Sequence, residues 1–119
     1  MYSACMLEID EDRFGELVDQ ALDTIPEHLL AMMDNVAVIV ADQGEDPGVL
    51  GLYDGIPLTE RGDYGGLVLP DRIFIYRIPL CQMCSTEAEL VHEVRVTVVH
   101  EIAHHFGIDD ERLDELGWD

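Results

Sequence analysis

The stretch from Thr86 to Gly107, TEAELVHEVRVTVVHEIAHHFG, carries the pattern of one long helix and decides how we expect the chain to fold. Thr86 and Glu89 have the spacing of a capping box, in which each side chain accepts the backbone N–H of the other residue. Gly107 is placed to end the helix as the residue after the C-cap. Between these ends, apolar residues recur at helical spacing and predict a stripe that faces a core: Leu90, Val91, Val94, Val98 and Ile102.

Two histidines of this helix, His100 and His104, lie four residues apart, so their imidazoles project from the same face. Two nitrogens arranged in this way can reach one Zn²⁺ ion at about 2.0–2.1 Å. Glu101 follows the first histidine, where its carboxylate can take the proton of a metal-bound water without binding the metal itself. The HExxH pattern therefore predicts a zinc site that generates hydroxide, as in zinc peptidases. The alternative is that both histidines are hydrogen-bonded core residues.

Gly107 and Asp110 extend this pattern to HExxHxxGxxD. A glycine here stops the helix and turns the chain back, which lets a residue three positions later approach the metal. Asp110 is the predicted third ligand. Asp109 and Glu111 are rival ligands, because residues 109–115 also have the pattern of an acidic first turn with Asp109 as its N-cap. Among the other histidines, we expect His105 beside the site or at the surface, and His28 and His92 to be exposed.

Apolar periodicity predicts the remaining elements. We expect a helix over about residues 10–23, a short helix ending near residue 33, a buried strand at 36–41, a brief strand within 48–53 and a strand at 72–78. The alternation in RIFIYRI, residues 72–78, suggests an edge or half-exposed position, and Pro79 is expected to close this strand. Residues 44–66 carry seven glycines and two prolines and predict a long irregular region. At 119 residues, we expect the chain to form a single domain, residues 1–119, of the α+β class.

Three segments of the chain together resemble a family of small bacterial zincin-like metallopeptidases: VVHEIAHHFGIDDERLDELG, GLYDGIPLTERG and PDRIFIYRIPL. The resemblance covers most of the chain from about residue 10. It implies a minimal zincin-like domain in which a small mixed sheet packs on the long active-site helix, with helices on either side. It also implies that His100, His104 and Asp110 bind Zn²⁺ and that Glu101 is the general base.

The predicted function is hydrolysis of peptide bonds by metal-activated water, with a peptide or protein as substrate. We expect the strand at 72–78 to hold the substrate by strand addition, together with the glycine-rich region. Tyr64, Tyr76 and Arg112 are candidates for stabilising the oxyanion. One alternative is a zinc-binding interaction module of the same fold without turnover. Another is a zinc endoribonuclease, whose HGxxHxxGxDH pattern differs from this chain at Glu101 and at the position of its last histidine.

The chain is strongly acidic, with 26 Asp and Glu residues against six arginines and a net charge of −20. Such a surface repels phosphate, so nucleic acids and anionic membranes are not expected partners. No stretch has the length of a membrane span, and the N-terminus lacks the basic start of a signal peptide, so we expect a cytoplasmic protein. Cys5, Cys81 and Cys84 are odd in number and fit reduced thiols. Cys81 and Cys84 have CxxC spacing, which we interpret as loop thiols, with a redox or metal role as the alternative.

Overall fold

A computed structural model of the chain describes residues 7–32, 36–55 and 71–116, without the side chains of Met32, Asp110 and Leu116. The described elements follow the order α1 (Glu11–Leu22), α2 (Glu27–Met32), β1 (Val36–Ala41), β2 (Gly51–Asp54), β3 (Asp71–Tyr76), α4 (Arg77–Met83), α5 (Glu87–His105) and α6 (Asp110–Leu116). Strands and helices thus fall close to the ranges that the sequence predicts, except that α4 was not expected. The second half of the glycine-rich region, residues 56–66, lies outside the described residues.

The three strands form a mixed sheet in the order β1-β3-β2. β1 runs parallel to β3, and β2 runs antiparallel to it. β3 is therefore the central strand, and the expectation that residues 72–78 form an edge was wrong. Among the described strands, β2 forms the edge on the side of β3 away from β1, and Tyr53 of β2 donates its N–H to a residue of α5.

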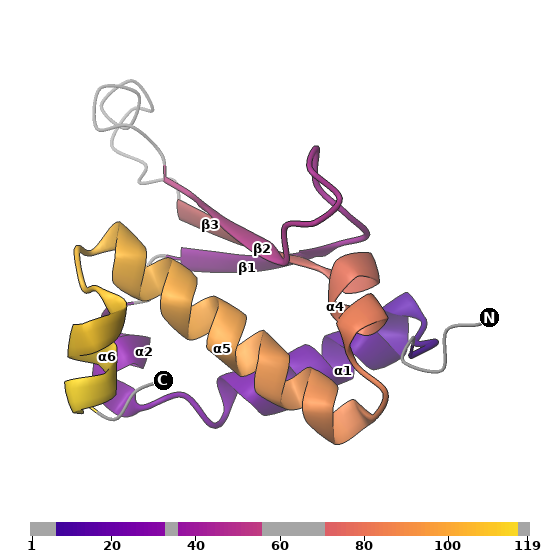
Figure 1. Cartoon of the computed structure of the whole chain (residues 1–119), viewed down its shortest axis with the longest axis horizontal. Coiled ribbons are helices and arrows are strands. Elements are labelled where there is room, and N and C mark those ends of the chain that lie inside the picture. The colour runs from indigo at the N-terminus through magenta and orange to yellow at the C-terminus, as the bar shows by residue number, and fades with distance from the viewer. Residues whose placement is uncertain (1–6, 33–35, 56–70, 117–119) are drawn as a thin grey trace.

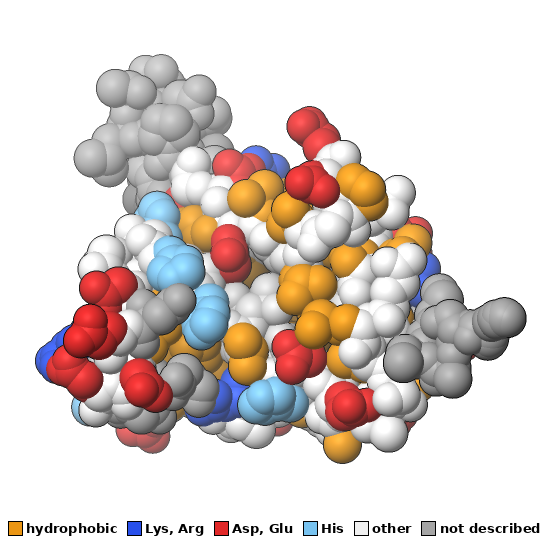
Figure 2. Space-filling view, in the orientation of Figure 1, with side chains coloured by type: hydrophobic (Ala, Val, Ile, Leu, Met, Phe, Trp, Pro, Cys, Tyr) orange, Lys and Arg blue, Asp and Glu red, His pale blue; other side chains and the backbone are white. Residues whose placement is uncertain are grey.

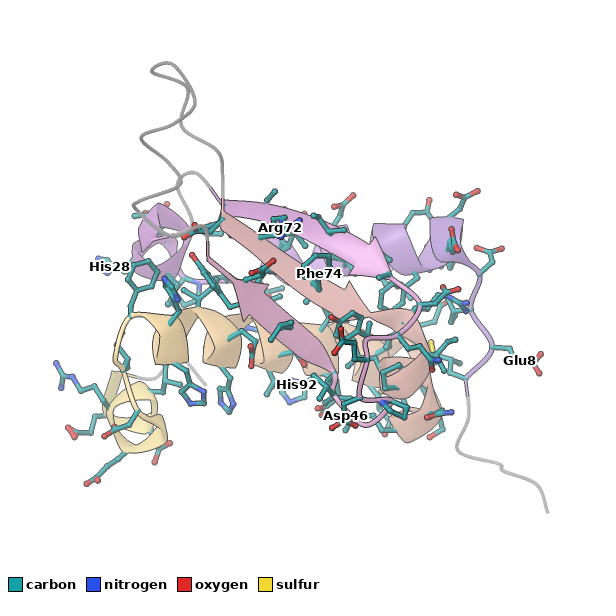
Figure 3. All side chains as sticks on the ribbon, turned by 90° about the horizontal axis from the view of Figure 1, so that it is seen from above. Glu8, His28, Asp46, Arg72, Phe74 and His92 are labelled. Carbon is teal, nitrogen blue, oxygen red and sulfur yellow. The ribbon has the colours of Figure 1, made fainter. Side chains whose placement is uncertain are left out.

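The sheet forms one layer and the helices form the other (Figure 1). Ile73 and Ile75 of β3 point toward the helices and are fully buried. Their neighbours Arg72 and Phe74 lie on the opposite face of the sheet, where the guanidinium of Arg72 sits 5.4 Å from the centre of the Phe74 ring (Figure 3). The alternation in this strand thus separates a face covered by helices from a face that the described helices leave open.

α5 packs against both the sheet and α1, so apolar residues on more than one side of it are buried. The buried residues of α5 are Leu90, Val94, Thr97, Val98, Val99, Ile102 and Ala103. α1 contributes Phe14, Leu17, Val18 and Ala21 to the same core. At the surface, Arg13 of α1 makes two hydrogen bonds to the carboxylate of Glu87, from Nη2 at 2.6 Å and from Nε at 3.1 Å. These bonds tie α1 to the first turn of α5.

Cys81 lies within α4, and Cys84 is the residue that ends this helix. Both thiols belong to the core and are only 2% and 1% exposed, so the interpretation of them as loop thiols was wrong. Burial raises the pKa of Cys81, and burial together with Glu93 and Glu89 raises the pKa of Cys84 to about 11. A thiol with such a pKa is mostly protonated near neutral pH, which makes it a poor nucleophile and metal ligand.

The mixed sheet packed on α5, with α1, α4 and α6 around it, confirms the expected α+β class and the expected packing of a small mixed sheet on one long helix. Among the described residues, no helix combines the length and apolar character needed to cross a membrane.

Candidate metal centre

The two ends of α5 fix the position of the candidate centre. At the start, the Thr86 hydroxyl accepts the N–H of Glu89 at 3.1 Å while the Glu89 carboxylate accepts the N–H of Thr86 at 3.1 Å, so the predicted capping box is present. At the other end, Gly107 has a φ of 80°, which favours glycine. The N–H of Gly107 bonds to the carbonyl of His104, and the N–H of Ile108 bonds to the carbonyl of Ala103. This is a Schellman motif, and it reverses the chain directly after the histidines.

His100 and His104 project side by side from the last turns of α5. Their ring centres lie 5.8 Å apart, and the ring planes are tilted by 35°. Two imidazoles that bind one zinc ion tetrahedrally at about 2.0–2.1 Å have ring centres roughly 5 Å apart, so this pair fits a shared ion after a small adjustment. His100 is half-buried and His104 is exposed. Histidine side chains gather on the surface over this end of α5, so the pair does not lie in a dry interior (Figure 2).

Glu101 points toward the sheet. Its Oε1 accepts the backbone N–H of Tyr53 at 3.0 Å, and its side chain is half-buried. Tyr53 lies on β2, and its N–H points away from β3, which leaves it available to the helix. Among the described residues, the second oxygen of Glu101 has no hydrogen-bond partner, so it can accept a proton from water beside the histidines.

Tyr53 is held by two further contacts that the sequence did not indicate. Its ring stacks on the ring of His105 with centres 3.9 Å apart and an angle of 16°. Its hydroxyl donates to Asp71 Oδ2 at 2.7 Å. His105 therefore supports the strand that anchors Glu101. This position of His105 agrees with the expectation that it lies beside the site or at the surface. The hydrogen bond between Tyr53 and Glu101 joins residues 48 positions apart, so no local pattern of the sequence could predict it.

The described side chains assign no third ligand to the two histidines. Asp110 is the first residue of α6, but its side chain lies outside the described part of the chain. One oxygen of Asp109 accepts the N–H of Arg112 at 2.9 Å, which makes Asp109 the N-cap of α6 as expected. The other rival, Glu111, is exposed. Among the described side chains, no group of three or more His, Cys, Asp or Glu residues comes together in a way that could hold a metal ion.

An open groove of about 260 Å³ runs between β2 and α5 and reaches the first histidine. It is lined by Val49, Leu50, Gly51, Glu93, Val96, Thr97, His100 and Glu101. Gly51 allows this close approach, because a Cβ atom there would lie 2.6 Å from Thr97 Cγ2 and 2.8 Å from the carbonyl oxygen of Phe74. The strand beside the candidate centre is thus β2. Residues 72–78 form the central strand and were therefore the wrong choice for the edge that binds a substrate.

The three candidates for oxyanion stabilisation have different outcomes. Tyr76 is 7% exposed and packs beside Gly44 and Phe74 on the face of the sheet opposite α5, so it does not serve the centre. Arg112 pairs with Glu115 on α6 at 3.5 Å. Tyr64 lies outside the described residues. A larger hollow of about 600 Å³, lined in part by Tyr76 and Leu52, also lies on that opposite face.

Comparison with known proteins finds a family and a solved structure that are similar to this chain. The model of a family described as zincin-like metallopeptidase matches residues 33–118. A solved structure of a conserved hypothetical protein from Thermo thermophilus is 22% identical, with a TM-score of 0.55. The alignment covers 92% of this chain and 100% of the other, and at this identity it supports the fold alone. A search of curated proteins found no match.

Proposed function

Because the chain belongs to the zincin-like metallopeptidase family, we propose that it is a zinc-dependent peptidase with its centre at the end of α5. In this proposal His100, His104 and Asp110 bind the ion and Glu101 is the general base. The observation that carries it is the neighbouring pair His100 and His104, 5.8 Å apart, next to a carboxylate that β2 holds at 3.0 Å. Zinc held there would polarise the scissile carbonyl and lower the pKa of a bound water.

Glu101 has the properties that the role of base requires. The N–H of Tyr53 fixes one of its oxygens at 3.0 Å, so the carboxylate has a defined orientation before any substrate arrives. The other oxygen is available to take the proton of the attacking water and to pass it to the leaving amine. An extended peptide along the groove between β2 and α5 would bring its scissile carbonyl next to the water that this carboxylate would activate.

The ligand set is tested by metal analysis of purified protein after exposure to zinc. We expect one tightly bound zinc in the wild type and in Glu101→Gln, and loss of that zinc in His100→Ala and Asp110→Ala. Glu111→Ala is the matched control, since it removes a neighbouring carboxylate that the proposal leaves without a role. Retention of zinc in Asp110→Ala with loss in Glu111→Ala would move the third ligand to Glu111.

Turnover is tested with a mixture of unfolded peptides. Glu101→Gln should lower cleavage by at least about 100-fold while keeping the zinc, because general-base catalysis contributes factors of this size. If the wild type binds zinc but cleaves no more than Glu101→Gln does, the protein is the zinc-binding interaction module and not a peptidase. An endoribonuclease is disfavoured because acidic side chains of Glu93 and Glu101 line the groove and the net charge is −20.

A further inference from the structure

The groove between β2 and α5 contains one charged residue that the proposed chemistry does not use, Glu93. It lines the groove together with His100 and Glu101, and its side chain is half-buried. Among the described residues it has no salt-bridge or side-chain hydrogen-bond partner, although the backbone carbonyl of Glu93 accepts the Thr97 hydroxyl at 2.8 Å. A partly desolvated carboxylate without a partner is well suited to bind a cation that arrives with a ligand.

Glu93 and His100 share one face of α5. They are seven residues apart, almost two full turns, so their side chains point the same way and their positions differ by about 10 Å along the helix axis. In Figure 3 the labelled His92, the neighbour of Glu93, lies beside the start of β2. Glu93 thus marks the end of the groove away from the candidate metal centre.

β2 sets the direction in which a peptide would lie. The Leu50 carbonyl accepts the N–H of Tyr76, so Leu50 and Tyr76 form a hydrogen-bonded pair of the antiparallel ladder. The backbone groups of Gly51 and Tyr53 therefore point away from β3, and the bond from Tyr53 to Glu101 agrees with this. A peptide that joins the edge would use the same groups.

β2 and α5 run in the same direction, because Gly51 lies against Thr97 while Tyr53 bonds to Glu101, further along both elements. A peptide antiparallel to β2 consequently runs from the histidines toward Glu93. Its residues after the scissile bond then lie at the Glu93 end of the groove. An extended chain advances about 3.4 Å per residue, so the roughly 10 Å between His100 and Glu93 corresponds to about three residues.

We propose that Glu93 determines specificity by binding a Lys or Arg side chain about three residues to the C-terminal side of the cleaved bond. This inference rests on the proposed peptidase function for its reference point, the cleaved bond. It names the substrate class as extended peptides with a basic residue after the cleavage site. The net charge of −20 acts in the same direction, because it attracts basic peptides to the whole surface.

The test compares cleavage sites in a mixture of unfolded peptides for the wild type, Glu93→Gln and Glu93→Arg, each loaded with zinc and read by mass spectrometry. We expect wild-type sites to be enriched in Lys and Arg near the third residue after the cleaved bond. Glu93→Gln should lose this enrichment, and Glu93→Arg should favour Asp and Glu at that position. Asp19→Asn is the matched control: it removes one negative charge from the exposed surface of α1, away from the groove, and should keep the wild-type preference.

A binding measurement separates this inference from the proposed function. Fluorescence anisotropy with zinc-loaded Glu101→Gln should show at least about tenfold tighter binding of an arginine-containing peptide than of its glutamate counterpart, because a charge-assisted bond is worth this much. Adding Glu93→Gln should remove most of this difference and leave only the part that the net charge of the protein produces. If no variant cleaves peptides but this selectivity is present and depends on Glu93, the peptidase proposal fails and the binding role of Glu93 stands. Cleavage or binding with equal preference in the wild type and Glu93→Gln would overturn the inference.

Discussion

Gly107 and Gly15 differ in the backbone conformation that each requires. Gly107 has a φ of 80° and ends α5, whereas Gly15 lies inside α1 with open space around the position of a Cβ atom. Gly107→Ala should lower the free energy of unfolding by about 1 kcal/mol, because a side chain is strained in the left-handed region. Gly15→Ala should raise it by up to about 1 kcal/mol, because alanine favours the helix. Urea unfolding curves give both values, and equal signs for the two variants would contradict this prediction.

Cys84 provides a prediction about pH. Burial, with Glu93 and Glu89, raises the pKa of its thiol to about 11, so the thiolate fraction of the folded protein at about pH 8 is far below that of an ordinary cysteine. Cys84 in the native protein should therefore react with iodoacetamide much more slowly than in urea, and its rate should keep rising with pH up to about 11. Peptide mapping by mass spectrometry measures each cysteine separately. If Cys84 of the native protein reacts as fast at about pH 8 as it does in urea, the prediction is wrong and this part of the core opens.

At the scale of elements, the pairing of α1 with α5 through Arg13 and Glu87 should depend on acid. The hydrogen bonds from Arg13 lower the pKa of Glu87 in the folded chain. A lowered pKa means that the pairing stabilises the fold above the pKa of Glu87 in the unfolded chain, and that this contribution is lost as the pH falls through the folded-state pKa. Glu87→Gln should be slightly less stable than the wild type near neutral pH and should become equal to it once the pH has fallen below the folded-state pKa of Glu87. Both side chains are substantially exposed, so the difference is small and should shrink in high salt.

The elements also show what a single sequence can and cannot predict. The two ends of α5 and most of its predicted apolar stripe agree with the structure, because its cap, its apolar spacing and its terminal glycine are local signals. α4 could not, because Pro79 suggested the end of a strand. Pro79 is instead the third residue of α4, and a proline in the first turn of a helix removes no helical hydrogen bond.

The order of the strands in the sheet is the second feature that the sequence could not predict. The alternation of Arg72, Phe74 and their neighbours indicated a half-exposed strand, and this is correct for one face of the sheet. It gave no information on whether β3 lies at an edge, because strand order depends on pairing with β2, a short strand well before it in the chain. The HExxH spacing predicted His100 and His104 as neighbours, whereas the contact between Glu101 and Tyr53 depends on that same long-range pairing.

For the molecule as a whole, the net charge of −20 should make stability depend strongly on salt. Repulsion among the carboxylates opposes the compact state, and ions screen it over about 8–10 Å near physiological strength. Raising NaCl from about 10 mM to about 500 mM should therefore raise the midpoint of thermal unfolding by several degrees. Differential scanning calorimetry measures the change, with equal osmolality of sucrose as the control. A midpoint that stays constant or falls in NaCl would mean that screening of this charge does not govern stability.

The Glu101 carboxylate and a bound peptide would compete for the backbone N–H of Tyr53. In the structure this N–H donates a hydrogen bond to the Glu101 carboxylate at 3.0 Å, and a peptide aligned on the edge of β2 would accept a hydrogen bond from the same group. One donor cannot satisfy two strong acceptors equally, so a peptide oxygen that arrives there would loosen the carboxylate and increase its freedom to turn toward water. Docking of the chain to be cut and release of the proton acceptor would then be a single event.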